Sequence, residues 1–430
     1  MNERLLHYIW QFRYFNTRSV VTTCGQAVEI LHTGEYNTDQ GPDFSNARIK
    51  LNDTLWAGAV ELHVKTSDWH KHGHSGDARY QKLVLHVVWQ HDLQELPANI
   101  PVLVLEPLVP AMMLQQYEKW MSSQQSVPCS NLAQEVSTLT WTAWKDRMLA
   151  ERLHSKIAAI EKHLAQTDQH WEEVFWRMLC RYFGGAVNGE SFEQLAISLP
   201  VTLLARHKNQ IHQLEALLLG QAGLLHKGFT GSYPVMLYNE YQFLQKKYGL
   251  RVINKPPSFL RMRPVNFPTI RLAQLAMLIH RSSHLFSQLK EAESLQTVWE
   301  LLDAGTNDYW LEHFKPDEPS ERNSKNIGRQ TMHILAINAI IPTLFAYGKK
   351  QGEEAQCIKV LEWLQQIPAE KNQLIAPFIS MQAGLAHAHD SQALLHLRKQ
   401  YCDARRCLEC GVGNALLRKN TAVALSPRST

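Results

Sequence analysis

Asp43 and Glu61 are the residues of this sequence best placed to hold a divalent cation. Asp43 stands in "GPDF", just before a strand-like segment, and Glu61 follows in "AVELHVK", residues 59–65. Alternation along a strand would send Glu61, His63 and Lys65 to one face and the apolar residues between them to the other. Hard Mg²⁺ prefers carboxylate oxygens, and in phosphodiester hydrolysis such a cation offsets charge and lowers the pKa of the attacking water. The spacing therefore predicts a Mg²⁺ or Mn²⁺ site at Asp43 and Glu61.

A basic group beside the two acids would complete this site. Such a side chain can orient the water or stabilise the charge that develops on phosphorus. His63 can act as a base near neutral pH, whereas Lys65 reaches inward only if the strand bends. Asp43, Glu61, His63 and Lys65 are therefore the candidate catalytic residues. The alternative interpretation is that these polar side chains line the solvated face of an antiparallel sheet.

The segment "SDWHKHGHSGD", residues 67–77, offers a second use of the same region. His70, His72 and His74 alternate, and imidazoles at this spacing can bind Zn²⁺ with Asp68 or Asp77 as a further ligand. This pattern predicts a zinc hydrolase as an alternative function. The histidines could equally be exposed loop residues, or contact a phosphate backbone beside the acids.

Three cysteines gather near the end of the chain. Cys402, Cys407 and Cys410 have four and two residues between them. Thiolates at this spacing can hold Zn²⁺ or an iron–sulfur cluster, and both normally take four ligands. Cys129, beside a proline, is the best remote candidate for the fourth ligand, and the alternative is that all are reduced cysteines of the core. The remaining cysteines are expected in the core: Cys24, Cys180 and Cys357.

Two groups of arginines could bind nucleic-acid phosphates. Arg261, Arg263 and Arg271 bracket a helix start at Pro268, where free backbone amides favour anions. Arg405 and Arg406 lie within the cysteine cluster, and neutralised backbone charge supplies most nonspecific affinity for nucleic acids. Anchoring to carboxylates and a solvated helix end are the alternative explanations.

The elements that would position these residues fall into two regions. Up to about residue 110 an opening helix precedes strands rich in β-branched residues, expected at 27–33, 47–51, 55–65 and 83–89 with a tight turn at 51–53 and a short helix within 75–82. After residue 112 the apolar spacing becomes helical, in segments 143–166, 171–185, 213–225, 269–283 and 331–352. We expect an α/β domain at 1–110, a connection at 111–140, and a helical domain at 141–430 that carries the cysteine cluster.

Composition limits the class of protein. The 430 residues are 45% hydrophobic and 20% charged with a net charge of +4, as in ordinary globular proteins. No run of 18 apolar residues and no signal-peptide pattern occurs, so we expect a cytoplasmic protein without a membrane span. The mild basic excess permits DNA or RNA as a partner without requiring it. Protein partners are not indicated.

The order of these elements resembles the PD-(D/E)XK nuclease superfamily. The shared features are a Pro-Asp at a strand start, a hairpin, and an acid two residues before a basic group. The resemblance implies an α+β fold, with a restriction-endonuclease-like mixed sheet and flanking helices followed by a larger all-α domain. It also implies Asp43 and Glu61 as metal ligands, with the Leu62 carbonyl as a third. His63 occupies the position that lysine normally holds, which puts catalytic competence in question.

A second resemblance covers nearly the whole chain. The segments "GPDF", "ELHVKTSDWHKHGH", "LHVVW", "RPVNFPTIRLAQLA" and "CLECGVG" are similar to an uncharacterised bacterial family, a domain of unknown function. A split cysteine set is similar in kind to the iron–sulfur staples of some helicase-associated nucleases, although the spacing differs. We expect a metal-dependent, nuclease-like protein acting on DNA or RNA phosphodiesters. The alternative is a noncatalytic nucleic-acid or protein-binding module on a degenerate nuclease scaffold.

Overall fold

The computed structural model divides the chain into two units. It describes residues 1–37, 40–72, 77–93, 100–282 and 284–425. The first unit comprises Met1–Asp146, Asn372–Gly384 and Leu394–Thr430, and the second comprises Arg147–Lys371 and Leu385–Ala393. The fold is mixed α/β, with a curled N-terminal sheet followed by a helical region. The sequence placed all of 141–430 in one helical domain, whereas the C-terminal residues group with the first unit.

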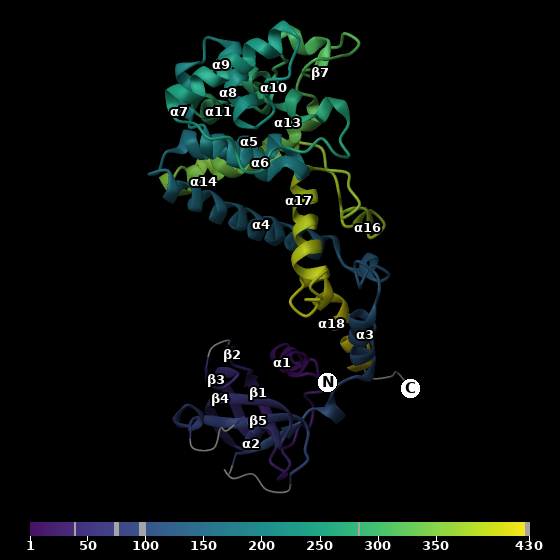
Figure 1. Cartoon of the computed structure of the whole chain (residues 1–430). Helices are drawn as coiled ribbons and strands as arrows, with labels where there is room; N and C mark the ends of the chain where they lie inside the picture. Colours follow the sequence, from purple (N-terminus) through teal and green to yellow (C-terminus); the bar gives the residue numbers. More distant parts are fainter. Residues whose placement is uncertain (38–39, 73–76, 94–99, 283, 426–430) are drawn as a thin grey trace. The chain divides into compact units, whose positions relative to one another are not determined.

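A mixed sheet forms the centre of the first unit (Figure 1). Its strands are β1 (Val28–His32), β2 (Glu35–Tyr36), β3 (Phe44–Leu51), β4 (Thr54–Lys65), β5 (Leu83–Gln90) and β6 (Val102–Val104). The order is β1-β3-β4-β5-β6, and β2 pairs with β3. β1, β3 and β4 pair antiparallel, whereas β5 lies parallel to β4 and β6 lies parallel to β5. The four predicted strands are therefore confirmed.

The hairpin between β3 and β4 sets the register of the sheet. Leu51 pairs with Thr54, so the turn consists of Asn52 and Asp53, as predicted from "LND". Asn52 has φ 50°, a left-handed conformation that asparagine tolerates, and its side-chain oxygen accepts the N–H of Ala27. The tight turn thus fixes which residues of the two strands face each other.

The centre of β4 is buried on both faces. Val60 and Leu62 are at most 1% exposed, and Glu61 and His63 are 4% and 1% exposed. The alternative that Glu61, His63 and Lys65 line a solvated face is therefore wrong for the first two residues. Helix α1 (Glu3–Gln11) packs against β4 and covers part of the sheet.

The connection between the parallel strands β4 and β5 is short. It contains α2 (Asp68–Lys71) and a 3₁₀ turn, Ala78–Tyr80, which lies inside the helix predicted at 75–82. Residues 75 and 76 of that prediction lie outside the described residues. Gly58 makes the close approach of β5 possible, because a Cβ there would lie 2.3 Å from the carbonyl oxygen of Lys82.

The end of the chain completes the first unit. Helix α18 (Gly411–Leu425) packs against α3 (Ala111–Ser122), as Figure 1 shows. Tyr14 donates a hydrogen bond of 2.6 Å to the side chain of Asn414, and Lys419 pairs with Glu135 at 2.8 Å. These contacts explain why residues after 394 group with the N-terminal sheet.

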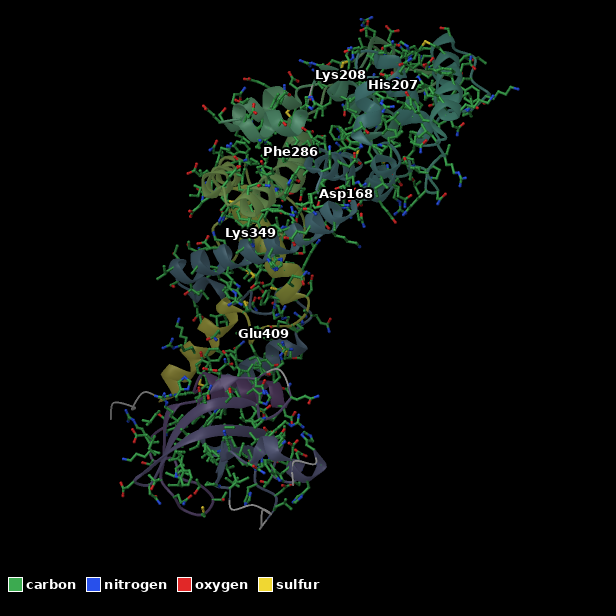
Figure 2. The ribbon with its side chains drawn as sticks, turned by 90° about the vertical axis from the view of Figure 1, so that its left-hand side faces the viewer. Asp168, His207, Lys208, Phe286, Lys349 and Glu409 are labelled. Atoms are coloured by element: carbon green, nitrogen blue, oxygen red, sulfur yellow. The ribbon has the colours of Figure 1, made fainter. Side chains whose placement is uncertain are left out.

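The second unit is built from helices. They are α4 (Thr138–Gln166, which begins in the first unit), α5 (Trp171–Phe183), α6 (Gly185–Ser198), α7 (Val201–Arg206), α8 (Ile211–Gln221), α9 (Ser232–Tyr248), α10 (Pro268–Arg281), α11 (Leu285–Glu291), α12 (Leu295–Leu302), α13 (Arg329–Leu335), α14 (Ile341–Gln351), α15 (Glu354–Gln366) and α17 (Ala388–Leu397, which ends in the first unit). All five predicted helical segments are confirmed. Aromatic packing joins them. Phe286, labelled in Figure 2, stacks on Trp171 with nearly parallel rings whose centroids are 6.1 Å apart.

One described helical run passes the length and composition test for a membrane span. It covers Arg329–Gln351, through a π-helical turn at Ala336–Ile340, and 67% of its most apolar window is buried within the protein. Core helices of soluble proteins pass the same test, so this run is weak evidence of a membrane. The expected cytoplasmic location stays a prediction.

Candidate metal centre

Asp43 and Glu61 lie side by side and hold each other in place. The backbone N–H of Asp43 donates to Glu61 Oε2 over 3.1 Å, and the N–H of Leu62 donates to Asp43 Oδ2 over 2.9 Å. Phe44 pairs with Val60 across the hairpin, so Asp43 and Glu61, the residues that follow this pair toward the open end, face each other. The pairing of the strands therefore brings the two predicted carboxylates together.

A β-bulge lies next to this pair. The register of β3 against β4 shifts by one residue between Phe44 and Ala47, and Asn46 within it has φ 57°. A bulge bends the strand and re-aims its side chains, and bulges are frequent beside active sites. Here it lets the start of β3 present Asp43 to β4 while the rest of the strand keeps its pairing.

The Glu61 carboxyl group is held in an environment that favours its neutral form. Burial, then the charge of Asp43 and more weakly that of Glu3, raise the pKa of Glu61 to about 8, while the hydrogen bond from the Asp43 N–H acts in the opposite direction. At neutral pH this carboxyl group therefore keeps its proton unless a cation replaces it. Buried, mutually repelling carboxylates are a frequent mark of a functional site.

His63 is the centre of a row of three imidazoles. Its Nδ1 lies 2.9 Å from Nε2 of the buried His86 on β5, and its Nε2 lies 3.2 Å from Nδ1 of the exposed His72. The same Nε2 is 3.6 Å from Glu61 Oε1. The row thus extends from the sheet interior, past the acidic pair, to the surface.

Helix α1 adds two polar side chains that the sequence analysis missed. Glu3, His63 and His72 bring their ligand atoms within 4.8 Å of one another, close enough to share a metal ion. One turn further along α1, His7 Nε2 lies 3.2 Å from Asp43 Oδ2, although it is not aligned as a hydrogen bond. The signal was available, because Glu3 and His7 are four residues apart and so share a face of an amphipathic helix.

Two aromatic residues form the wall of the site. Trp69 meets His63 edge to face at 6.3 Å and meets Tyr80 in the same way at 5.8 Å. Burial, then the charges of Glu61 and Asp43, raise the pKa of Tyr80 to about 12, so its hydroxyl stays protonated beside the acids. His86 was also missed, although a lone histidine inside the apolar strand "LVLHVVW" is a recognisable signal.

The other residues predicted for this region lie elsewhere. Lys65 is exposed at the end of β4, where its N–H donates to Asp68, so its side chain does not follow His63 into the interior. Asp68 also pairs with Lys71, and Asp77 pairs with Arg79. His70 is exposed, and His74 lies outside the described residues. Among the described histidines that were predicted to bind zinc, His72 is the one that lies beside His63 and Glu3.

All four predicted cysteine ligands lie buried in the first unit. Cys129, Cys402, Cys407 and Cys410 are 7–8% exposed. Burial and then the charges of Cys410 and Cys407 raise the pKa of Cys129, which shows that these distant segments meet. The other cysteines differ from the expectation in part: Cys180 is buried, Cys357 is partly buried, and Cys24 is exposed. The prediction of Cys24 as a core residue was wrong, because it lies in the turn before β1.

The arginines expected at the helix start divide into two kinds. Arg261 and Arg263 are exposed. Burial lowers the pKa of Arg271 to about 10, and its guanidinium is occupied within the protein. It donates to three neutral side chains, Gln274 at 3.0 Å, Asn266 at 2.7 Å and Thr331 at 3.0 Å. Arg271 is therefore a structural residue rather than a free phosphate contact.

The two arginines of the cysteine segment are also engaged within the protein. Arg405 donates to the backbone carbonyls of Ser123 and Gln125. Arg406 pairs with Glu409 and lies over the ring of Tyr401 at 4.6 Å. Their first role is to hold the chain end in place.

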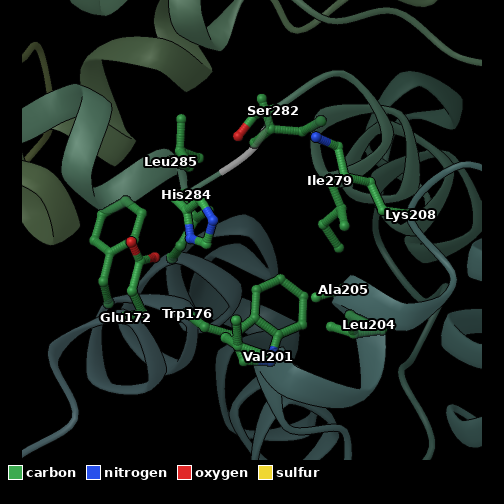
Figure 3. Close-up of a pocket in the computed structure, with 13 residues that line it drawn as sticks. Glu172, Trp176, Val201, Leu204, Ala205, Lys208, Ile279, Ser282, His284 and Leu285 are labelled. Atoms are coloured by element: carbon green, nitrogen blue, oxygen red, sulfur yellow. The ribbon is translucent and has the colours of Figure 1, made fainter.

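The second unit contains a cavity of about 280 Å³, shown in Figure 3. Its lining is mainly apolar, with Trp176 and Leu204 among the contributors, and Glu172, Lys208 and His284 add polar atoms. None of the residues singled out from the sequence is among its described lining residues. The described residues that line this cavity thus lie apart in the sequence from the predicted carboxylate and cysteine sites.

The comparisons with known proteins return one match. The family model described as "Protein of unknown function (DUF2851)" matches residues 3–373. That range includes the carboxylate and histidine cluster and Cys129, and it ends before Cys402. No curated protein and no solved structure matches the chain.

Proposed function

The chain belongs to the DUF2851 family of proteins of unknown function, and from its site we propose a metal-dependent, nuclease-like protein that acts on DNA or RNA phosphodiesters. The topology supports a restriction-endonuclease-like fold for the first unit: a helix, an antiparallel hairpin, a short helical crossover and a parallel strand follow in that order. Asp43 just before β3, Glu61 on β4 and His86 on β5 all lie around His63 in the middle of this sheet.

The relation between Asp43 and Glu61 carries the proposal. Two carboxylates are braced against each other, and one of them is buried where its charge is unfavourable. A purely structural role would be served better by an apolar or amide residue, since burying a carboxyl group beside a second acid costs free energy. A divalent cation offsets both charges and makes this arrangement favourable.

The side chains of the site fit a divalent cation of intermediate softness. Asp43, Glu61 and Glu3 offer carboxylate oxygens, and His72 offers an imidazole nitrogen within reach of Glu3, which leaves His63 for another role. Oxygen ligands suit Mg²⁺ and Mn²⁺, and nitrogen ligands shift the preference toward Mn²⁺. A bound cation would supply a Lewis acid for a phosphoryl oxygen and would lower the pKa of the attacking water.

His63 fits the role of general base. Hydrolysis forms a bond from water to phosphorus, breaks the bond to the leaving oxygen, and requires the water to lose a proton. In the tautomer in which Nδ1 donates to His86, Nε2 of His63 carries no proton and would accept one from the water, with the neighbouring His72 as the path to solvent. Histidine here takes the position that lysine holds in the resembled superfamily.

A noncatalytic binding module on a degenerate nuclease scaffold is the second candidate. The observation that favours it is the position of Lys65, the lysine of β4. This residue is exposed at the end of the strand, and its backbone N–H donates to Asp68. A site without a cation beside the phosphate could still bind nucleic acid through its histidines and exposed arginines.

The test is cleavage of supercoiled plasmid and of labelled single-stranded DNA and RNA with Mn²⁺ or Mg²⁺. We expect cleavage by the natural chain and a loss on the order of 100-fold or more in Asp43→Asn and Glu61→Gln, which keep the hydrogen-bond acceptors. Glu29→Gln, at an exposed position of β1, is the matched control and should retain activity.

The outcomes separate the two candidates. Cleavage that persists in both Asp43→Asn and Glu61→Gln would exclude this site as the catalytic centre. Binding of the same substrates without cleavage under every divalent cation would favour the noncatalytic module.

A further inference from the structure

The cysteine cluster joins two segments that are far apart in the sequence. Cys129 follows α3, whereas Cys402, Cys407 and Cys410 precede α18. After burial, the charges of Cys410, Cys129 and Cys407 all raise the pKa of Cys402, and the charge of Cys410 raises that of Cys407. Four buried thiols from two segments thus lie within electrostatic reach of one another.

The backbone around Cys410 is arranged to stabilise a thiolate. Burial raises the pKa of Cys410, and the N–H groups of Val412 and Gly413, in the first turn of α18, act in the opposite direction by donating to its sulfur. Donors at a helix start favour a negative sulfur. A Cβ at Gly413 would lie 2.4 Å from the carbonyl oxygen of Cys407, so glycine permits the turn to close this tightly.

Two arginines lie near the cluster, one of which, Arg398, also pairs with Asp403 at 2.7 Å. The charge of Arg398 lowers the pKa of Cys402 and that of Arg405 lowers the pKa of Cys407, although burial is the larger influence on both and acts in the opposite direction. Arg405 also donates to the carbonyl of Ser123, in the segment that leads to Cys129. The same arginine therefore joins the two segments and offsets negative charge.

We propose that Cys129, Cys402, Cys407 and Cys410 bind a metal through four thiolates, forming a structural centre distinct from the carboxylate site. Each thiol releases its proton to solvent when it becomes a ligand. Four buried thiols with N–H donors and arginines around them match the needs of a closed structural metal site. Reduced core cysteines would need neither the donors nor the charges.

The spacing bears on the kind of metal. A tetrahedral zinc ion, with Zn–S distances of about 2.3 Å, holds its four sulfurs within about 4 Å of one another. In the described part of the chain, the group whose ligand atoms all lie within 4.8 Å is Glu3, His63 and His72, and the cysteine sulfurs form no such group. An iron–sulfur cluster does not impose that limit, because several iron atoms lie between its thiolates.

The experiment is metal analysis of the full chain purified anaerobically, with iron, zinc and sulfide measured per chain together with absorption near 400 nm. Iron with sulfide and the absorption band, or about one zinc per chain without them, would each support the thiolate centre. We expect this metal to be lost in Cys407→Ser and Cys129→Ser and retained in Cys24→Ser, whose cysteine is exposed. Absence of stoichiometric metal from the natural chain would overturn the proposal, as would retention in the first two variants.

A measurement on the natural chain covers the case in which these variants do not fold. Alkylation followed by mass spectrometry should find the four clustered cysteines protected, and a chelator that removes the metal should expose them. Protection unchanged after metal removal would mean that burial alone shields the thiols, and the proposal would fail. Asp43→Asn should keep the cysteine-bound metal, so the failure of the nuclease proposal would leave this one standing.

Discussion

Asp43 and Glu61 are cross-braced, because the N–H of Asp43 donates to the Glu61 carboxylate while the Asp43 carboxylate accepts the N–H beside Glu61. Both bonds lie within a paired hairpin, so the carboxylates stay together as long as the sheet is intact. A cation would meet a preorganised site, and binding would not have to supply the free energy of ordering it.

Replacing Glu61 should separate two effects of this residue: the free-energy cost of burying its carboxyl group and its contribution to metal binding. Glu61→Gln removes a buried ionisable group, so without metal at pH 8 its free energy of unfolding should equal or exceed that of the natural chain. Mn²⁺ at 100 times the Kd of the natural chain should stabilise that chain by about 2.7 kcal/mol and should stabilise Glu61→Gln by clearly less. Chemical unfolding with and without Mn²⁺ measures both. Equal stabilisation of the two proteins would contradict a metal role for Glu61.

The affinity for Mn²⁺ should rise with pH. The pKa of Glu61 is raised to about 8, mainly by burial, so below that pH a cation must displace a proton. Each pH unit between about 5 and 8 should therefore strengthen binding by up to about tenfold, with a plateau above 8. Calorimetric titration at several pH values measures the slope. The slope should be smaller in Glu61→Gln, where histidine protonation alone competes with the cation.

His72 and His70 form a matched pair for testing the histidine row. Both are exposed and lie in or next to α2. His72 differs from His70 because it contacts His63 and is one of the three neighbouring candidate ligands Glu3, His63 and His72. His72→Ala should weaken Mn²⁺ binding on the order of 10-fold, whereas His70→Ala should not. Neither change should alter the melting temperature of the metal-free protein by more than a degree or two, since both side chains are exposed. Equal effects on metal affinity would show that the contact with His63 is unimportant.

Replacing the arginines near α10 should have two different effects, one on nucleic-acid affinity and one on stability. Arg261→Ala with Arg263→Ala should lower the affinity for DNA or RNA and reduce its salt dependence by about one unit of slope per lost phosphate contact, at unchanged stability. Arg271→Met should instead cost about 1–3 kcal/mol of stability, because three neutral side chains lose their donor. Filter binding over a salt series and chemical unfolding distinguish the two effects. A stable Arg271→Met protein with weakened nucleic-acid binding would reverse this assignment.

Glu215 in the second unit should make stability fall as pH rises. Burial raises its pKa to about 7, although Trp310 and Tyr233 donate to it at 2.9 and 2.7 Å. The folded state therefore holds a proton that the unfolded state releases above about pH 4.5, and stability declines between about pH 4.5 and 7 by on the order of 3 kcal/mol. Glu215→Gln should flatten this decline, as measured by urea unfolding at pH 5 and pH 8. An identical decline in the variant would mean that another group causes it.

The parts of the fold that could be predicted are those fixed by local chemistry. The turn at Asn52 and the alternation in β4 predicted the hairpin, because a two-residue turn sets its register. That register alone would place Asp43 opposite Leu62, and the bulge between Phe44 and Ala47, which the sequence did not reveal, shifts it to Glu61. Glu3 could not be assigned to the site in the same way, since the direction in which α1 packs on the sheet depends on distant contacts. Cys129 stays a prediction as the fourth ligand. It was chosen because three candidate ligands implied a missing one, and the charges of Cys410 and Cys407 reach it.

The errors have physical causes as well. Alternation assigned Lys65 to the face of Glu61 and His63, but β4 ends at this residue and its side chain meets solvent. Helical periodicity assigned the last residues to the helical domain, although the contacts of Tyr14 and Glu135 place them in the first unit. Periodicity identifies an element and its buried face, and it carries no information about which partner covers that face.

The return of residues 394–425 to the first unit affects the order in which the protein can be made. A ribosome releases residues 147–371 before the segment that holds α18, so every helix of the second unit within that range can form while the first unit still lacks its last piece. The unit that is synthesised first is therefore completed last, and a nascent chain stalled before Cys402 would carry the acidic pair on a finished sheet but an incomplete unit.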